Sequence, residues 1–386
     1  MNKKFFLGYQ ITNLIFQLLL IPIVYKNFIL SNIGVVLSYN IIAQILLIMI
    51  GGGSSVIGVT GKGKNNILID ESIIFRIQFI ISSAVSFLFL LVSFYISSFI
   101  SLNIIFFIYL LSSSIASYWL IVKIEEFKYL FVANIFTKAL FLSSLFFMIK
   151  FAHFSESTIY ALSIMLEYAI FNIVLLFNIN IRAYFMTSLS SFFSLNDFYS
   201  YIHVSVVELI KSLSKDIDKI VLIVFATGQS IAIYNLVFKL ADIPANLISQ
   251  LNYTQFKKYS NLKYAKKLAT ILSVIAITLE ILFFDYIVSF FVNNGDIFYF
   301  YELKTYILFF ILLILIRSHK QIVIFELYHK SAFEMLQKIL ISYIFLYLWL
   351  SFLLKIDIKT ILIITLCLEA FLVICIKYFI KRLQYV

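Results

Sequence analysis

Long uninterrupted apolar runs dominate this sequence and limit what the chain can fold into. The runs at 33–51 and 75–97 contain almost no charge, and each is about 20 residues long, the length that a helix needs to cross a bilayer. Strands of a membrane barrel would instead alternate in polarity over about ten residues. A helix also bonds its own backbone groups, which lipid requires. The pattern therefore predicts a bundle of membrane-spanning helices.

The composition supports the same interpretation. Hydrophobic residues make up 63% of the chain and charged residues 13%, whereas soluble domains are about half apolar and about a quarter charged. The basic start is followed by an apolar stretch without a small-residue cleavage site, so we expect this stretch to be the first membrane helix. Cys367 and Cys375 share one apolar segment and fit neither a disulfide framework nor a metal knuckle.

Twelve candidate spans are predicted, in two halves of six. Their approximate limits are 5–25, 33–51, 75–97, 101–122, 129–150, 157–178, 203–226, 229–252, 268–291, 297–316, 337–355 and 359–380. The predicted domains are an N-terminal lobe (1–178), a linker (179–202) and a C-terminal lobe (203–386). The expected fold class is all-α, a polytopic integral membrane protein of about twelve transmembrane helices in two six-helix lobes, as in many transporters.

Lysine and arginine are distributed unevenly among the predicted loops. With the N-terminus in the cytoplasm, the inside regions hold most of the basic residues, among them Arg317 and Lys320. The outside loops and outer span ends hold only Lys26, Lys150, Lys304, Lys355 and Lys359. Because cytoplasmic loops carry the basic excess, this bias predicts that both termini are cytoplasmic.

The span at 203–226 carries an unusual number of charges. Its helical period places one set on a single face: Glu208, Lys211, Ser212, Lys215 and Lys219, with Asp216 and Asp218 at either side. A charge at mid-membrane costs roughly 2.5–3.5 kcal/mol on insertion scales, so the face is expected to line water or to pair internally. Glu208 with Lys211, and Lys215 with Asp218, could form neutralising i,i+3 pairs. In a third interpretation the helix starts later and the lysines reach the interface.

Two further polar stripes accompany this face. The span at 229–252 carries Asn235, Lys239, Asp242, Asn246 and Ser249, and the span at 5–25 carries Gln10, Asn13 and Gln17. The three stripes are expected to converge on one polar cavity. The candidate substrate-binding residues are Lys211, Lys215, Lys219, Asn235, Lys239, Asp242, Asn13 and Gln17.

Carboxylates within spans are candidates for proton coupling, because a buried carboxyl group can carry a proton. The candidates are Glu167, Glu208, Asp218, Glu280 and Glu369. The alternative for each is a structural ion pair. The coupling ion, a proton or sodium, is left open.

Signatures of catalysis and of metal binding are missing from the sequence. The segment GGGSSVIGVTGKGK lacks the GxxxxGK[ST] spacing of a phosphate loop. The four histidines have no metal-ligand spacing, and no catalytic triad can be recognised. We therefore expect a protein without covalent chemistry, bound metal or cofactor.

Three segments carry a resemblance to a known family: Tyr118–Phe141 with Trp119 and Glu125, Asp218–Pro244 with Asp218, Lys219 and Tyr234, and Ile21–Gln44. With these the chain resembles the Wzx-type O-antigen flippases of the polysaccharide transporter family, relatives of the multidrug and toxic-compound extruders. It departs from the family pattern in two places. Gly34-Val35 stands where Gly-Tyr is usual, and Val122-Lys123 where the family has Gln-Gly.

The resemblance implies a function for the whole chain. An undecaprenyl-pyrophosphate-linked oligosaccharide, the repeat unit of O-antigen or a similar surface polysaccharide, would move from the cytoplasmic to the periplasmic face of a bacterial inner membrane by alternating access. The implied partners are this glycan, membrane lipids and the polymerase and chain-length regulator of the pathway, with no nucleic acid.

Two alternatives stay open. An O-antigen polymerase or related lipid-sugar transferase would need a large outside loop, and the predicted outside loops are short and lack arginine. A drug exporter would prefer an acidic cavity, whereas the 203–226 face is rich in lysine.

Overall fold

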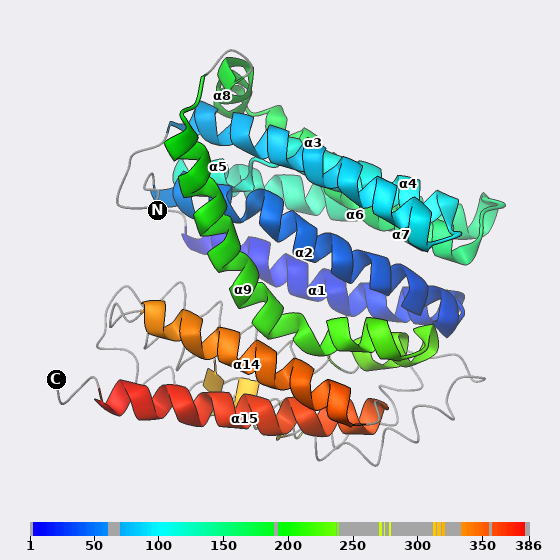
Figure 1. The fold of residues 1–386 in the computed structure, drawn as a ribbon. Coiled ribbons are helices and arrows are strands. Elements are labelled where there is room, and N and C mark those ends of the chain that lie inside the picture. Colours follow the sequence, from blue (N-terminus) through cyan, green and yellow to red (C-terminus); the bar gives the residue numbers. More distant parts are fainter. Residues whose placement is uncertain are drawn as a thin grey trace. The chain divides into compact units, whose positions relative to one another are not determined.

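The computed structural model describes residues 3–60, 70–188, 192–236, 333–354 and 357–382, together with isolated residues between 238 and 320. The regular elements in these ranges are helices (Figure 1). They are α1 (Lys3–Asn27), α2 (Leu30–Thr60), α3 (Glu71–Ile96), α4 (Ile100–Leu111), the short 3-10 helix η2 (Ser112–Ile115), α5 (Tyr118–Lys123), α6 (Phe127–Phe151), α7 (Glu156–Leu176), α8 (Ile179–Ser188), α9 (Leu195–Phe225), α14 (Phe333–Leu353) and α15 (Ile358–Arg382).

Polar side chains cap several of these helices. The Ser72 amide donates to Asp70 Oδ1 at the start of α3 (2.8 Å), and the Thr158 amide donates to Ser155 Oγ at the start of α7 (3.3 Å). At the start of α9, Ser194 Oγ accepts from the Asp197 amide, and Asp197 Oδ2 accepts from the Ser194 amide. Such caps satisfy amides that have no partner within the helix. Because of this last cap, α9 begins at Leu195, earlier than the predicted start at 203.

The chain divides into two compact units that are discontinuous in sequence. One contains Met1–Phe16 and Val35–Ser212, and the other contains Gln17–Gly34 and Leu213–Val386. These bounds differ from the predicted lobes, because residues 17–34 group with the C-terminal part and residues 179–212 with the N-terminal part. The division into two lobes of six helices stays a prediction.

The first unit contains a bundle in which α3 packs on α4, α4 on α7, and α6 on α7 (Figure 1). The predicted span at 101–122 is interrupted here, because α4 ends at Leu111 and is followed by η2 and α5. Gln78 Nε2 donates to the carbonyls of Ser113 (2.6 Å) and Ala116 (3.0 Å), and Ser82 Oγ donates to that of Leu110 (3.0 Å). These side chains of α3 thus bind the backbone carbonyls of the segment where α4 ends, one of which, that of Ser113, also accepts from the Ala116 amide.

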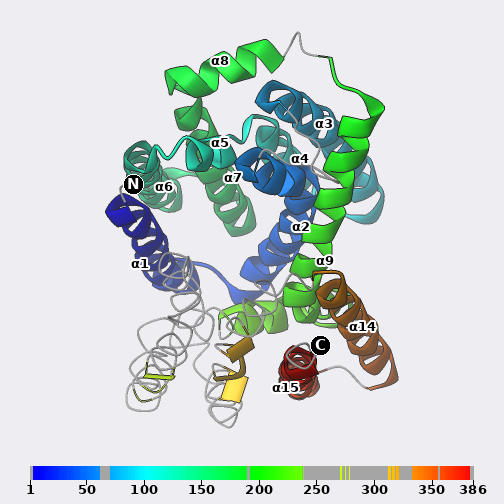
Figure 2. The same cartoon turned by 90° about the vertical axis from the view of Figure 1, so that its left-hand side faces the viewer.

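The second unit contains the antiparallel pair α14 and α15, which lie side by side (Figures 1 and 2). Tyr347 and Thr365 join the pair by a hydrogen bond of 2.8 Å between their hydroxyl groups. The chain also approaches itself closely at Gly34, where a Cβ atom would lie 1.7 Å from the Gly228 carbonyl oxygen. Only glycine fits such a backbone contact. Nearby, the Tyr25 hydroxyl donates to the Ala232 carbonyl at 2.8 Å.

Within the described residues, seven helical stretches are long and apolar enough to cross a membrane: Leu30–Ile57, Glu71–Ile96, Ile100–Lys123, Phe127–Phe151, Glu156–Leu176, Leu336–Leu353 and Lys359–Lys381. Each coincides with a predicted span. The third of these stretches comprises α4, η2 and α5. The predicted spans at 5–25 and 203–226 are helical, as α1 and α9. Those at 229–252, 268–291 and 297–316 lie largely outside the described residues.

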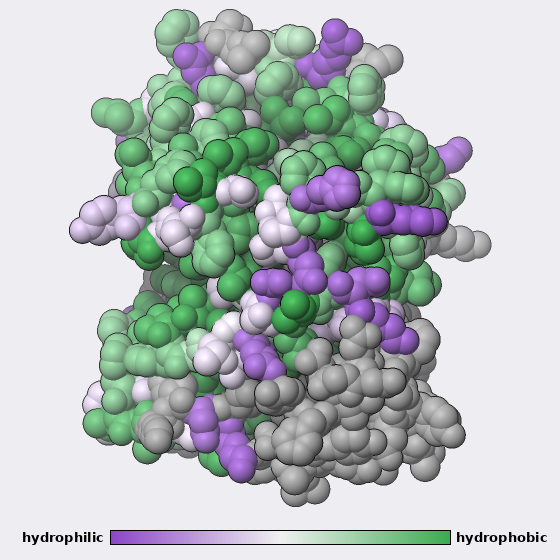
Figure 3. Space-filling model, turned by 90° about the vertical axis from the view of Figure 1, so that its right-hand side faces the viewer, coloured by the Kyte–Doolittle hydropathy of each residue, from purple (hydrophilic) through white to green (hydrophobic). Residues whose placement is uncertain are grey.

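The surface of the described helices is strongly apolar. On α3, Tyr95 is 93% exposed and Leu91 is 68% exposed, and on α14, Phe345 is 70% exposed. Hydrophobic side chains also cover most of the described surface in the view of Figure 3. Large contiguous apolar surfaces are rare on soluble monomers, so lipid is the natural environment of these faces.

Candidate functional site

The predicted charged residues of α9 are all described, and the three lysines among them differ in whether they form an ion pair. Lys211 forms an ion pair with Glu208, as one of the open alternatives predicted. Lys219 pairs with Asp216 at 2.5 Å. Lys215 is exposed, and it makes no ion pair among the described residues.

The predicted pair between Lys215 and Asp218 is wrong. Asp218 is only 1% exposed and lies on the buried side of α9, beside Ile217 and Val221. Lys215 lies on the exposed side. The i,i+3 spacing allows such a pair, but burial of Asp218 directs its carboxylate toward other partners.

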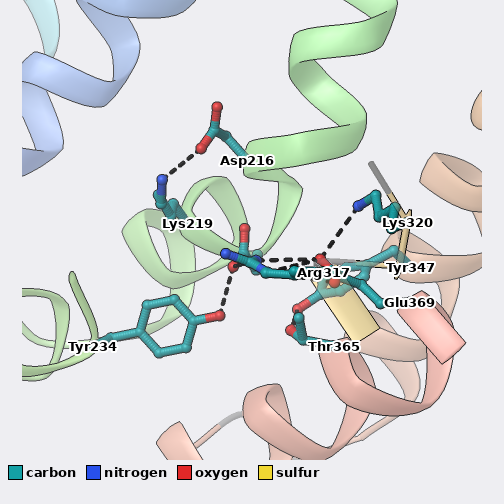
Figure 4. A network of polar contacts seen from close by, with 9 residues as sticks. Asp216, Lys219, Tyr234, Arg317, Lys320, Tyr347, Thr365 and Glu369 are labelled. Carbon is teal, nitrogen blue, oxygen red and sulfur yellow. Dashed lines mark hydrogen bonds and ion pairs between the residues drawn. The ribbon is translucent and has the colours of Figure 1, made fainter. Parts of the chain in front are cut away.

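Those partners form a buried network in the second unit (Figure 4). The Tyr234 hydroxyl donates to Asp218 Oδ2 at 2.6 Å, and the same oxygen lies 3.8 Å from Arg317 Nη2. Arg317 also contacts Glu369 on α15. Its Nε donates to the two carboxylate oxygens of Glu369, at 3.2 and 3.3 Å. Lys320 Nζ lies 3.3 Å from Glu369 Oε1.

Among the residues that the structure describes, the charges of this network balance. Arg317 and Lys320 carry the positive charges and Asp218 and Glu369 the negative charges, and all four side chains are buried. Removing an ion from water costs several kcal/mol unless a partner and hydrogen bonds compensate. Each member therefore depends on the others to stay charged in the interior.

Each of the two cations also lies over an aromatic ring. The Arg317 guanidinium lies 3.6 Å from the centroid of the Phe238 ring, and Phe238 stacks on Tyr234 with centroids 4.6 Å apart. Lys320 Nζ lies 5.7 Å from the centroid of Tyr343. Such cation–π contacts are strongest when the cation is desolvated. Within the described part of the chain, Asp218 Oδ1 has no hydrogen-bond partner.

The distribution of basic residues places Arg317 and Lys320 in an inside region, and the structure shows that both side chains are buried. Both belong to a helical segment, and both contact Glu369 near the middle of the apolar helix Lys359–Lys381. The physical reason is the carboxylate itself, because an acid in the middle of an apolar span needs a counterion. The sequence signal for this contact was the presence of two cations, three residues apart, at the end of the run at 297–316.

The first unit contains a separate intramembrane pair. Lys138 on α6 forms an ion pair with Glu167 on α7, and Lys138 Nζ lies 4.0 Å from the centroid of the Phe16 ring. Both charged residues lie near the middle of their spans. Glu167, Glu208 and Glu369 thus all have a cationic partner. This is the structural ion pair that the sequence left open as the alternative to proton coupling. A role in proton coupling stays a prediction for each.

The remaining predicted site residues are placed only in part. Asn235 is buried, and its Nδ2 has no hydrogen-bond partner in the described part of the chain. Asn13 is half-buried on α1. The Gln17 side chain, Lys239, Asp242 and Glu280 lie outside the described residues. The convergence of the three polar stripes on one cavity therefore stays a prediction.

In the described ranges, no group of three or more His, Cys, Asp or Glu side chains could hold a metal ion. The charged groups that the structure brings together instead pair with one another. They are suited to holding helices together, and Lys215 is suited to meeting an external anion.

The helices and their apolar surfaces define the class of this chain, a polytopic helical membrane protein. No family model matches the chain, and no curated protein matches it.

Proposed function

We propose that this chain is a flippase for a lipid-linked oligosaccharide, moving an undecaprenyl-pyrophosphate-linked repeat unit from the cytoplasmic to the periplasmic face of a bacterial inner membrane. The observation that carries the proposal is Lys215, an exposed lysine on α9 whose neighbouring lysines are neutralised. In the same proposal the chain has twelve spans, both termini lie in the cytoplasm, and no covalent bond is made or broken.

The electrostatics of α9 favour an anionic ligand. Glu208 and Asp216 neutralise Lys211 and Lys219, so the positive charge left on this face belongs to Lys215. A charge on a membrane helix is costly and commonly marks a substrate path. The pyrophosphate of a lipid carrier is poorly tolerated in hydrocarbon, and an ammonium group in a hydrated groove lowers that barrier.

The class of transported molecule is tested by removing the gene. A flippase predicts that single lipid-linked repeat units accumulate on the cytoplasmic face of the membrane. Translocated units that stay unpolymerised would contradict the proposal and favour a lipid-sugar polymerase.

The role of Lys215 is tested by charge reversal. Lys215→Glu should abolish export while the amount of folded protein is unchanged, because the side chain is exposed and makes no ion pair among the described residues. Lys377→Glu is the matched control, since Lys377 is an exposed lysine on another membrane helix, α15. Lys211→Glu is less informative, because it also breaks the pair with Glu208. Normal export by Lys215→Glu would remove this residue from the substrate path.

A further inference from the structure

The helices α14 and α15 enclose a groove that the function proposed above does not use. Its volume is about 380 Å³, and it is lined by one face of each helix, from Lys338 to Leu346 on α14 and from Phe371 to Phe379 on α15. The eight steps from Lys338 to Leu346, at 1.5 Å rise each, give the groove a length of about 12 Å. Apart from Lys338, its lining is apolar or carries a small hydroxyl or thiol group.

The two ends of the groove differ in charge. Lys338 is exposed and lies close to the beginning of the apolar helix Leu336–Leu353. Because α15 runs antiparallel to α14, the exposed Lys377 and Lys381 lie toward the same end of the pair. The opposite end is formed by Leu346 and Phe371. The groove is therefore basic where its helices leave the membrane and apolar toward the middle of the membrane.

We infer that this groove binds an anionic phospholipid, with one acyl chain along the groove and the headgroup phosphate at Lys338. The apolar lining matches a hydrocarbon chain, and the lysine lies at the depth of lipid headgroups. Basic pockets between membrane helices attract anionic headgroups, at about 1 kcal/mol for each lysine or arginine near the surface. A zwitterionic lipid offers the same chain without the net charge, so the proposal predicts a headgroup preference.

The floor of the groove contacts the buried ion network. Tyr343 lines the groove, and Lys320 Nζ of the network lies 5.7 Å from the centroid of its ring. A lipid chain in the groove would pack on a ring that also contacts a network cation. The proposed lipid would therefore lie next to the buried ion network of the second unit.

The two cysteines of the chain provide a built-in test. Cys375 lines the groove, whereas Cys367 is exposed on α15 and does not belong to the lining. Cys367→Ser leaves only the groove thiol, and Cys375→Ser leaves only the control thiol. The full chain is purified in detergent, and its modification by N-ethylmaleimide is followed by intact mass while phosphatidylglycerol or phosphatidylcholine is added. Phosphatidylglycerol should protect Cys375 at about fivefold lower concentration than phosphatidylcholine, and neither headgroup should be preferred at Cys367.

Two lysine variants locate the headgroup. Lys338→Gln should remove the preference for phosphatidylglycerol at Cys375, while Lys150→Gln, an exposed lysine on α6 and outside the lining, should keep it. Elution of both variants as folded monodisperse protein makes the comparison valid. Equal protection by the two lipids, a preference that persists in Lys338→Gln, or identical protection of Cys367 would overturn the inference. Protection by undecaprenyl phosphate alone would also overturn it, because the groove would then belong to the transported lipid.

Discussion

At the scale of single residues, the most consequential feature is Glu369. Its carboxylate accepts from Arg317 and Lys320 in the interior of the second unit, and the three side chains are almost completely buried. Removing one member of such a group leaves an uncompensated buried charge, which commonly costs about 3–5 kcal/mol. The network should therefore be a point at which small changes have large effects.

Glu369→Gln is expected to lower the midpoint of thermal unfolding in detergent markedly, because it removes the charged carboxylate that Arg317 and Lys320 share. Lys377→Gln, on the exposed side of the same helix, should leave the midpoint unchanged. Adding Lys320→Gln to Glu369→Gln restores the charge balance and should recover part of the loss. Equal midpoints for Glu369→Gln and Lys377→Gln would show that the network does not stabilise the fold.

The sequence predicted contacts within one helix better than contacts between helices. The pair of Glu208 and Lys211 follows from i,i+3 spacing, because helical geometry fixes that distance. The contact of Arg317 with Glu369 joins residues that are far apart in the chain, and no periodicity relates them. Asp218 shows the limit of the local rule, since burial turned its carboxylate away from Lys215 toward Tyr234.

At the scale of helices, two glycines of α2 differ in the space around them: Gly34 is closely packed and Gly51 is not. A Cβ atom at Gly34 would lie 1.7 Å from the Gly228 carbonyl oxygen, whereas one at Gly51 would have only the Ser54 hydroxyl near it, at 3.8 Å. The first position cannot accept a side chain unless the backbone moves. The second can, and alanine favours a helix over glycine by roughly 0.5–1 kcal/mol.

Gly34→Ala is therefore expected to reduce the yield of monodisperse protein in size-exclusion chromatography, while Gly51→Ala should leave the yield unchanged or increase it. Both substitutions lie on α2, so a general effect on the membrane insertion of this helix would change the yield of both variants alike. A normal yield of Gly34→Ala would contradict the close approach at Gly228.

The helix boundaries show why the sequence predicted spans better than their interruptions. Seven predicted spans match apolar helices, because length and hydropathy decide membrane crossing. No proline or glycine near Leu111 marks the end of α4 in the sequence. The helix ends there at the serines of 112–114, where Gln78 donates to the Ser113 carbonyl. The early start of α9 follows from the cap by Ser194 and Asp197, just outside the apolar run.

At the scale of the whole molecule, the charge bias predicts an even number of spans with both termini in the cytoplasm. A C-terminal fluorescent protein should therefore fluoresce, and a C-terminal alkaline phosphatase should be inactive. Fusions after Lys26 should give the opposite result, since this lysine lies in a predicted outside loop. An active phosphatase at the C-terminus would require an odd number of spans and would remove the two-lobe arrangement of six helices each.

Translocation by the purified chain tests the central claim most directly. The chain is reconstituted into vesicles that carry a lipid-linked oligosaccharide in both leaflets, and a glycosidase added outside reports how much of the sugar becomes accessible with time. The account predicts complete digestion with the native chain and with Lys377→Glu, and digestion of only the outer leaflet, about half, with Lys215→Glu. Digestion that stops at the outer leaflet with the native chain would contradict a flippase.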